Sequence, residues 1–265
     1  EVKVNADNHS DFNNSARTWI SRNLLYRFWW GPCARKIEPY FDRFFGVTPA
    51  RIDFMYKVYG IPKGKTDLLV MGADDELLQK AENPQVRKEI RDQYHIKESD
   101  FLVVTGGKID HNKTQTLLLM EAVRNMKEDR LRLVVFGSVE EELKEPFFRL
   151  CDGKKIQYTG WATAEQAYQY FSAADLVVFP GLHSVYWEQV VAQGIPMLCK
   201  YMEGMTHVDI GGNVRFLMED STALIQKELT GLLEQPEVYH NMKKAAMSAK
   251  RKDFSYREIA RKCIR

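Results

Sequence analysis

The sequence predicts an α/β protein whose main part is a doubly wound parallel sheet, and three observations indicate this fold class. Short strand patterns alternate with helical patterns along most of the chain. The strands of the second part, such as 101–105 and 131–136, are apolar on both faces, which is typical of parallel strands covered by helices on both sides. Several of these strands end directly in glycine or proline. Ligands of such sheets bind at the carboxyl ends of the strands.

The first part of the chain carries short and irregular signals. Its expected elements are a strand at 2–6, a helix at 16–30 that Gly31 and Pro32 end, a strand at 44–48, and a helix at 51–59 that Gly60 and Pro62 end. The polar loop 63–65 follows, and we place a domain boundary there.

After this loop the alternation becomes regular. We expect strands at 68–71, 101–105, 131–136, 156–159, 176–179 and 197–199. We expect helices at 84–94, 113–126, 139–150, 163–173 and 186–193. The end of the chain, from residue 236, has the pattern of polar, basic helices. Right-handed crossovers between such strands give a doubly wound lobe.

The composition is that of a globular protein with enough apolar residues for a core. The chain of 265 residues is 45% hydrophobic and 28% charged, which excludes disordered and fibrous classes. Its 38 basic and 36 acidic residues leave a net charge of +2, which argues against nucleic acid as a partner. No apolar run is long enough to span a membrane, and no signal peptide is visible.

The four cysteines, Cys33, Cys151, Cys199 and Cys263, lie far apart and form no CxxC pair. They predict reduced thiols in a cytoplasmic protein rather than disulfides or a zinc site. No other pattern predicts a metal site.

The first candidate site is Gly106-Gly107-Lys108 with Lys113 at the start of the next helix. Glycines allow a backbone to approach a phosphate, and a helix start offers free N–H groups. Lys108 and Lys113 could then neutralise a diphosphate, or they are simply two solvated lysines. The pattern is neither GxGxxG nor a Walker motif.

The second candidate is the loop after strand 176–179. It carries His183, Ser184 and Val185 and enters a helix that has Glu188 in its first turn. The amides of Ser184 and Val185 could hold a phosphate, and Glu188 could accept hydrogen bonds from a ribose. The competing interpretation is a loop histidine and a carboxylate that favours a helix start.

Two further candidates for substrate contacts, Trp161 and His9, each follow an expected strand. Trp161, after Gly160, could stack on a base or could serve packing alone. His9 lies among Asp7, Asn8, Ser10 and Asp11. A histidine beside carboxylates can act as an acid, a base or a charge stabiliser, although turns rich in Asp and Asn have the same pattern.

Residues 17–30 interleave arginines with tryptophan, leucine and phenylalanine. This pattern fits a helix that lies on a membrane surface. It also fits an amphipathic helix packed on the protein with solvated arginines, and the sequence leaves both interpretations open.

Three motifs, in this order, resemble the donor-binding lobe of GT-B glycosyltransferases of family 4, also called glycosyl transferases group 1. The first is Gly107-Lys108-Ile109 with Lys113, the second is the strand Ala174 to Pro180, and the third is the helix exit Glu188 to Pro196. Residues 40–75 are similar to the family's crossing from the acceptor lobe to the donor lobe.

This resemblance implies a GT-B fold with a partial, Rossmann-like acceptor lobe at 1–65, a donor lobe at 66–235 and helices that cross back at 236–265. We therefore expect the chain to be a fragment. The implied activity is a retaining, hexosyltransferase-type transfer from a nucleotide diphosphate sugar to an acceptor hydroxyl in polysaccharide or glycoconjugate synthesis. The implied acceptor is a carbohydrate or a lipid-linked molecule, and no metal or other cofactor is expected. The membrane-surface interpretation of residues 17–30 would suit a lipid-linked acceptor at the inner face of a membrane.

By the same resemblance, Gly107, Lys108 and Lys113 bind the diphosphate together with the amides of Ser184 and Val185, and His9 lies near the reacting sugar carbon. One departure concerns the family's two glutamates, of which the first is missing. Either Glu188 or Gln189 corresponds to the second; we favour Glu188 as the ribose ligand and His183 as the replacement sugar contact. The alternatives are a nucleotide-sugar epimerase of the same fold and a degenerate nucleotide-sugar-binding protein.

Overall fold

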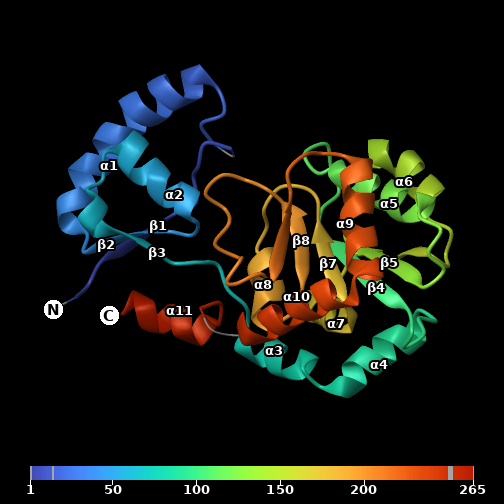
Figure 1. The fold of residues 1–265 in the computed structure, drawn as a ribbon. Helices are drawn as coiled ribbons and strands as arrows, with labels where there is room; N and C mark the ends of the chain where they lie inside the picture. The colour runs from blue at the N-terminus through green and yellow to red at the C-terminus, as the bar shows by residue number, and fades with distance from the viewer. Residues whose placement is uncertain (1, 14, 250–252, 265) are drawn as a thin grey trace. The chain divides into compact units, whose positions relative to one another are not determined.

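The computed structural model describes residues 2–13, 15–249 and 253–264, which belong to two compact units (Figure 1). The smaller unit contains Glu1–Gly72, Met202–His207 and Tyr256–Arg265. The larger unit contains Ala73–Tyr201 and Val208–Ser255. The chain therefore passes between the units four times, after Gly72, Tyr201, His207 and Ser255.

The larger unit is built on a six-stranded sheet with the order β6-β5-β4-β7-β8-β9, and every pair of neighbours is parallel. The strands are β4 (Phe101–Gly106), β5 (Leu131–Phe136), β6 (Ile156–Tyr158), β7 (Leu176–Phe179), β8 (Met197–Lys200) and β9 (Val214–Leu217). The order runs outward in one direction from β4 and in the other from β7. The boundary between β4 and β7 is therefore the topological switch point, where doubly wound sheets bind ligands.

Helices cover both faces of this sheet (Figure 1). They are α3 (Asp75–Ala81), α4 (Pro84–Gln93), α5 (Gln115–Asn125), α6 (Lys144–Leu150), α7 (Ala164–Ala173), α8 (Tyr186–Gln193), α9 (Thr222–Glu234) and α10 (Pro236–Ala249), with a 3₁₀ turn at Glu141–Leu143. One core cluster joins the central strands to α5 and α9 through side chains such as Leu119, Val135 and Leu229. The α/β fold class with parallel sheets is confirmed.

The smaller unit has a three-stranded parallel sheet with the order β1-β2-β3. Its strands are β1 (Asn5–Asn8), β2 (Arg43–Gly46) and β3 (Thr66–Leu68). Its helical segments are η1 (Ser21–Trp30), α1 (Gly31–Ile37), η2 (Glu38–Tyr40), α2 (Pro49–Phe54), η3 (Met55–Tyr59), η4 (Lys63–Lys65) and α11 (Tyr256–Cys263).

Two expectations for this unit are wrong. The strand expected at 68–71 in the second lobe is β3, which ends at Leu68 and pairs with β2 in the smaller sheet. The compact units divide after Gly72. Gly31 and Pro32 do not end the helix. It continues to Ile37 because η1 is a π-helix, in which Gly31 N–H donates to Tyr26 O. The wider i→i−5 spacing relieves the clash of the proline ring with the carbonyl of residue i−4.

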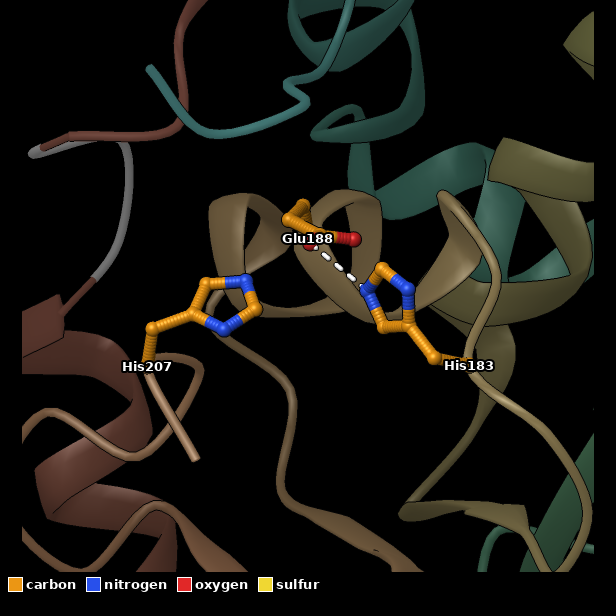
Figure 2. A group of neighbouring side chains, drawn as sticks. All are labelled: His183, Glu188 and His207. Carbon is orange, nitrogen blue, oxygen red and sulfur yellow. Dashed lines mark hydrogen bonds and ion pairs between the residues drawn. The ribbon is translucent and has the colours of Figure 1, made fainter. Parts of the chain in front are cut away.

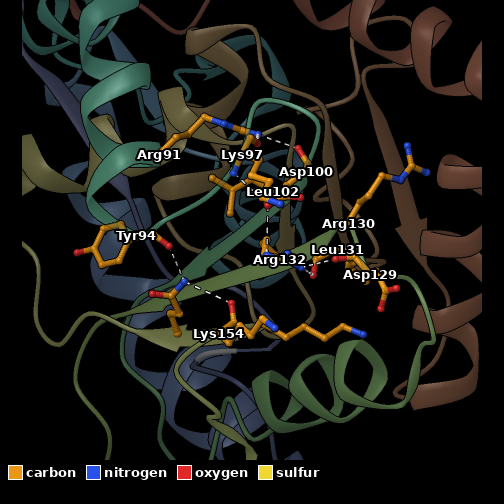
Figure 3. A network of polar contacts seen from close by, with 12 residues as sticks. Arg91, Tyr94, Lys97, Asp100, Leu102, Asp129, Arg130, Leu131, Arg132 and Lys154 are labelled. Carbon is orange, nitrogen blue, oxygen red and sulfur yellow. Dashed lines mark hydrogen bonds and ion pairs between the residues drawn. The ribbon is translucent and has the colours of Figure 1, made fainter.

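The amino ends of the central strands are held by a network of arginine side chains (Figure 3). Arg91 is 2% exposed and donates from Nη2 to the carbonyls of Lys97 and Asp100, at 2.7 Å each. Arg132 Nε lies 3.3 Å from Asp100 Oδ2. Arg91 Nη1 also lies 3.2 Å from Asp175 Oδ2. The buried guanidinium of Arg91 and the partly buried one of Arg132 therefore both have acceptors within the protein, as charges removed from water require.

The cysteines lie apart, as the sequence predicts, and all four are free thiols. Burial raises the pKa of the Cys199 thiol well above its usual value, as do the nearby carboxylates of Glu188 and Asp209. Within the part of the chain that the structure describes, no helix combines the length and the apolar character needed to cross a membrane.

Candidate functional site

A small pocket lies at the switch point, between the loops that follow β4 and β7. One wall is formed by Gly106, Lys108, Lys113 and Thr116, and the other by Pro180, Gly181 and Ser184. Both loops leave the carboxyl ends of neighbouring strands. The structure thus brings together the two candidate motifs, which are far apart in the sequence.

The first wall is a loop whose backbone is fixed against β5. Gly107 has a φ angle of +121°, which side-chain-bearing residues rarely adopt, so this position needs glycine. Its N–H donates to Phe136 O at 3.1 Å, and the N–H of Ile109 donates to Ser138 O at 2.8 Å. The loop can therefore present its following residues, including Lys108, in a defined orientation.

The two lysines of this wall differ in environment. Lys108 is exposed, and its Nζ lies 3.2 Å from Asp110 Oδ2. Lys113 is half-buried and forms no ion pair with any residue that the structure describes. Burial lowers the pKa of Lys113, and the positive charge of Lys108 lowers it further, while Asp110 acts in the opposite direction. A bound anion would relieve this unfavourable charge, because it supplies the missing counterion.

Asp110 is held in its charged form although burial acts against it. Burial raises the pKa of Asp110. Hydrogen bonds from Lys108 and from the N–H of Asn112, together with the charges of both lysines, lower it by more, so the pKa is below its usual value. The N–H of Lys113 donates to Asp110 O at 2.8 Å, so Asp110 also shapes the turn into α5.

The second wall approaches the first very closely at Gly181. A Cβ atom added there would lie 3.3 Å from Gln115 Oε1 and 3.5 Å from Lys113 Cγ. Ser184 and Val185 then lead into α8, where the N–H of Trp187 donates to Ser184 O at 3.0 Å and that of Gln189 to Val185 O at 3.1 Å. The amides of Ser184 and Val185 precede these donors, at the positive end of the helix dipole.

His183 and Glu188, two predicted substrate contacts, pair with each other (Figure 2). His183 Nε2 lies 2.8 Å from Glu188 Oε1, and their side chains are 3% and 0% exposed. The His183 ring also packs edge-on against Trp187, with centroids 5.0 Å apart. The two residues are five positions apart in the sequence, so the start of α8 brings the histidine back over the glutamate.

Trp161 lies in the loop that follows β6, the outer strand on one side of the sheet, and is 72% exposed. It is not among the residues that line the switch-point pocket. The N–H of Gly137 donates to Gly160 O at 2.7 Å, which links the ends of β5 and β6 beside it. Its role in base binding stays a prediction.

His9 belongs to the smaller unit, whereas Lys108 and Lys113 belong to the larger one. Its Nε2 lies 2.8 Å from Asp7 Oδ2, and both side chains are well exposed. The predicted histidine–carboxylate pair therefore exists, and its catalytic role stays a prediction.

Two residues at the site were missed by sequence reasoning: Asp110 and Thr116. Asp110 and Lys113 have the i, i+3 spacing of a polar turn before a helix, and this signal could have found the aspartate. Thr116 lies one turn after Lys113 and could have been found by the same helical spacing. Gly181 belongs to the strand-end segment Pro180-Gly181, which the sequence indicates as part of a ligand crevice. Its close approach to Gln115 and Lys113 depends on a distant segment and was not predicted.

The sequence pattern described as "Glycosyl transferases group 1" matches residues 86–249, which is more than half of the chain. The chain belongs to this family. The matched segment of this group 1 glycosyltransferase includes both walls of the pocket and most of the larger unit.

Solved structures of similar fold include a glycosyltransferase from Rickettsia africae ESF-5, with 12% identity, a TM-score of 0.72, and coverage of 98% of this chain and 68% of that one. Alr3699/HepE from Anabaena in complex with UDP has 14% identity, a TM-score of 0.76, and coverage of 99% and 71%. UDP-GlcNAc 2-epimerase from Neisseria meningitidis bound to UDP-GlcNAc has 14% identity, a TM-score of 0.68, and coverage of 99% and 69%. No curated protein sequence matches the chain significantly. At these identities the likeness shows the GT-B fold alone.

Proposed function

We propose that this group 1 glycosyltransferase transfers a hexosyl unit from a nucleotide diphosphate sugar to an acceptor hydroxyl with retention of configuration. The observation that carries the proposal is the convergence, at the switch point, of Lys108, Lys113 and the start of α8. Two positive side chains and oriented amides around one pocket suit a diphosphate.

The residues of the pocket would act electrostatically. Breaking the bond between sugar and phosphate leaves negative charge on the departing diphosphate and positive charge on the sugar ring. Lys113 and Lys108 stabilise that diphosphate from one wall, and the amides of Ser184 and Val185 stabilise it from the other. Because basic side chains neutralise the leaving group, we expect turnover to persist after chelation of divalent metal ions.

The remaining residues would bind the rest of the donor. Glu188, which pairs with His183, would accept hydrogen bonds from the ribose diol of the donor. The bound ribose would then replace part of the contact between His183 and Glu188. Trp161 would stack on or border the base. His9, oriented by Asp7, would stabilise charge near the reacting carbon.

A thermal-shift screen against UDP-, GDP-, ADP- and TDP-sugars tests donor binding. A ligand at 100 times its dissociation constant adds about 2.7 kcal/mol to the free energy of unfolding. The matching nucleoside monophosphates are the control, because they lack the second phosphate and should stabilise the chain much less. Equal stabilisation by monophosphate and diphosphate would contradict the assignment of the pocket.

Product analysis then separates the candidate reactions. Incubation with the donor and a carbohydrate or lipid-linked acceptor should give a glycoside with the anomeric configuration of the donor, measurable by NMR. An epimerised or hydrolysed sugar from donor alone would indicate the epimerase. Donor binding without any product would indicate a nucleotide-sugar-binding protein.

A further inference from the structure

A cavity of about 710 Å³ lies at the amino ends of β4, β5 and β6, and its volume is typical of small-molecule sites. It is bordered by Asp100, directly before β4, by Arg132, at the start of β5, and by the turn 153–155, directly before β6. The switch-point pocket is bordered by Gly106, at the other end of β4. The full length of β4 therefore separates the two, and the donor chemistry does not use this cavity.

Two carboxylates of the cavity are already engaged within the protein. Asp100 is 6% exposed, and its Oδ2 accepts a hydrogen bond from the N–H of Lys97 at 3.0 Å and lies 3.3 Å from Arg132 Nε. Glu128 Oε1 accepts hydrogen bonds from the Nε and the backbone N–H of Arg130, at 3.2 and 3.1 Å, and these bonds lower the pKa of Glu128. Both carboxylates therefore serve the arginines and the backbone rather than the lysines of the cavity.

Two of these lysines have no acceptor for the side chain. Lys97 and Lys154 are exposed, and neither ammonium group forms an ion pair or a hydrogen bond with any residue in the described ranges (Figure 3). Their backbones are fixed, because the carbonyl of Lys97 accepts from Arg91 Nη2 at 2.7 Å and the N–H of Lys154 donates to Asp152 Oδ1 at 2.9 Å. The protein thus holds both residues at the cavity and leaves their charges to a bound molecule.

A third lysine, Lys155, is partly buried beside them. Its Nζ donates to the carbonyl of Met126, which is a neutral acceptor. Burial lowers the pKa of Lys155; the charge of Asp129 acts against this and that of Arg132 adds to it, so the pKa stays below its usual value. The surrounding carboxylates therefore do not fully compensate this charge, and a bound anion would stabilise it.

We propose that this cavity, which we call the amino-end site, binds a small molecule that carries phosphate groups, through Lys97, Lys154 and Lys155. Lysine binds phosphate as a point charge, and a phosphomonoester brings about 1.5 to 2 negative charges at pH 7. Three lysines from two separate loops suit a ligand with more charge than one carboxylate, and the cavity has room for an organic part. The proposal goes beyond the proposed function and does not depend on it.

Protection of lysines from acetylation, measured by mass spectrometry of the full chain with and without inorganic pyrophosphate, tests this site residue by residue. Pyrophosphate should slow the acetylation of Lys97, Lys154 and Lys155 at constant ionic strength, and added salt should weaken the protection. Protection of Lys108 and Lys113 reports separately on the donor pocket, so either site can fail without the other.

Calorimetric titration with pyrophosphate then measures the affinity, in the background Lys108→Ala with Lys113→Ala so that the donor pocket does not contribute. Adding Lys97→Ala with Lys154→Ala should lower the affinity by about tenfold or more, because two hydrogen bonds from charged groups are lost. Both residues are exposed, so circular dichroism should show an unchanged fold.

The matched control is Lys227→Ala with Lys244→Ala in the same background. It removes the same charge from two exposed positions of α9 and α10 that do not border the cavity, and it should leave the affinity unchanged. Equal affinity in the Lys97 and Lys154 variant and in this control would overturn the proposal. Protection confined to the donor pocket, or equal protection of every exposed lysine, would overturn it as well.

Discussion

The two ends of the strands in the six-stranded sheet, called here the amino edge and the carboxyl edge, both carry basic residues, but in different environments. At the amino edge, Arg91 lies buried among carbonyls and the carboxylate of Asp175, so its charge is satisfied inside the protein. At the carboxyl edge, Lys113 is half-buried, has a lowered pKa, and has no ion pair with any residue that the structure describes. Basic residues therefore serve stability where the protein supplies the acceptor, and point to a ligand where it does not.

The largest expected effect is at the amino edge. Arg91→Ala removes a buried guanidinium and leaves its acceptors unsatisfied, so the free energy of unfolding should fall by about 3–5 kcal/mol. Urea unfolding measures this. Lys154→Ala, an exposed residue of the same edge, should change stability by less than about 0.5 kcal/mol. A change in the free energy of unfolding as small as that of Lys154→Ala would contradict the stabilising role of Arg91 at the amino edge.

At the carboxyl edge the same type of change should affect turnover instead. Lys113→Ala removes a stabilising charge from the leaving group, which typically costs about 2.7–4 kcal/mol of barrier, or about 10²–10³ in kcat. The unfolding midpoint should stay near that of the native chain, since Lys113 has no ion pair among the described residues to lose. Native-like turnover with the true donor would refute the role of Lys113.

Gly107→Ala should combine both kinds of effect. Its φ of +121° strains any residue with a Cβ, at about 1–3 kcal/mol of unfolding free energy. Because the loop carries Lys108, donor affinity should fall as well. The comparison is Gly231→Ala in α9, where no atom lies within 4 Å of an added Cβ and where alanine is the better helix former. If Gly107→Ala and Gly231→Ala had the same free energy of unfolding, the loop would tolerate a Cβ at position 107 and the prediction would be wrong.

The smallest effect is a shift in pH dependence. The lysine must be protonated to bind a diphosphate, and burial lowers the pKa of Lys113 below the usual value. As pH rises, the contribution of Lys113 should therefore be lost earlier than that of an ordinary exposed lysine. Lys113→Arg should remove this alkaline loss, because a guanidinium stays charged. Titration of donor affinity against pH, in both proteins, measures it.

The sequence predicted the larger unit well because its strands and helices carry strong periodic signals. The bounds of β5, β7 and α8 match the expected elements. In the smaller unit the same reasoning failed at Gly31 and Pro32, since a π-helical repeat has no pattern that a search for i, i+4 spacing detects. The strand β9 and the helix α9 were not predicted at all.

The site was predicted in part for a similar reason. Lys108, Lys113, Ser184 and Val185 belong to local motifs at strand ends, and strand order alone brings them to the switch point. The pairing of His183 with Glu188 was not foreseen, because it depends on how the start of α8 folds back on the preceding loop. The motif residue Asp175 holds the amino edge, where it accepts a hydrogen bond from the N–H of Leu102 at 2.8 Å.

The path of the chain has a consequence for how its two units can be studied. Since the chain passes between them four times, a single proteolytic cut cannot release either one intact. Cleavage at Gly72 would still leave residues 202–207 of the smaller unit joined at both ends to the larger one. The units therefore behave as tethered partners whose local concentration is set by the linkers and is insensitive to dilution. Expressing the larger unit alone would require replacing residues 202–207 with a short loop that joins Tyr201 to Val208.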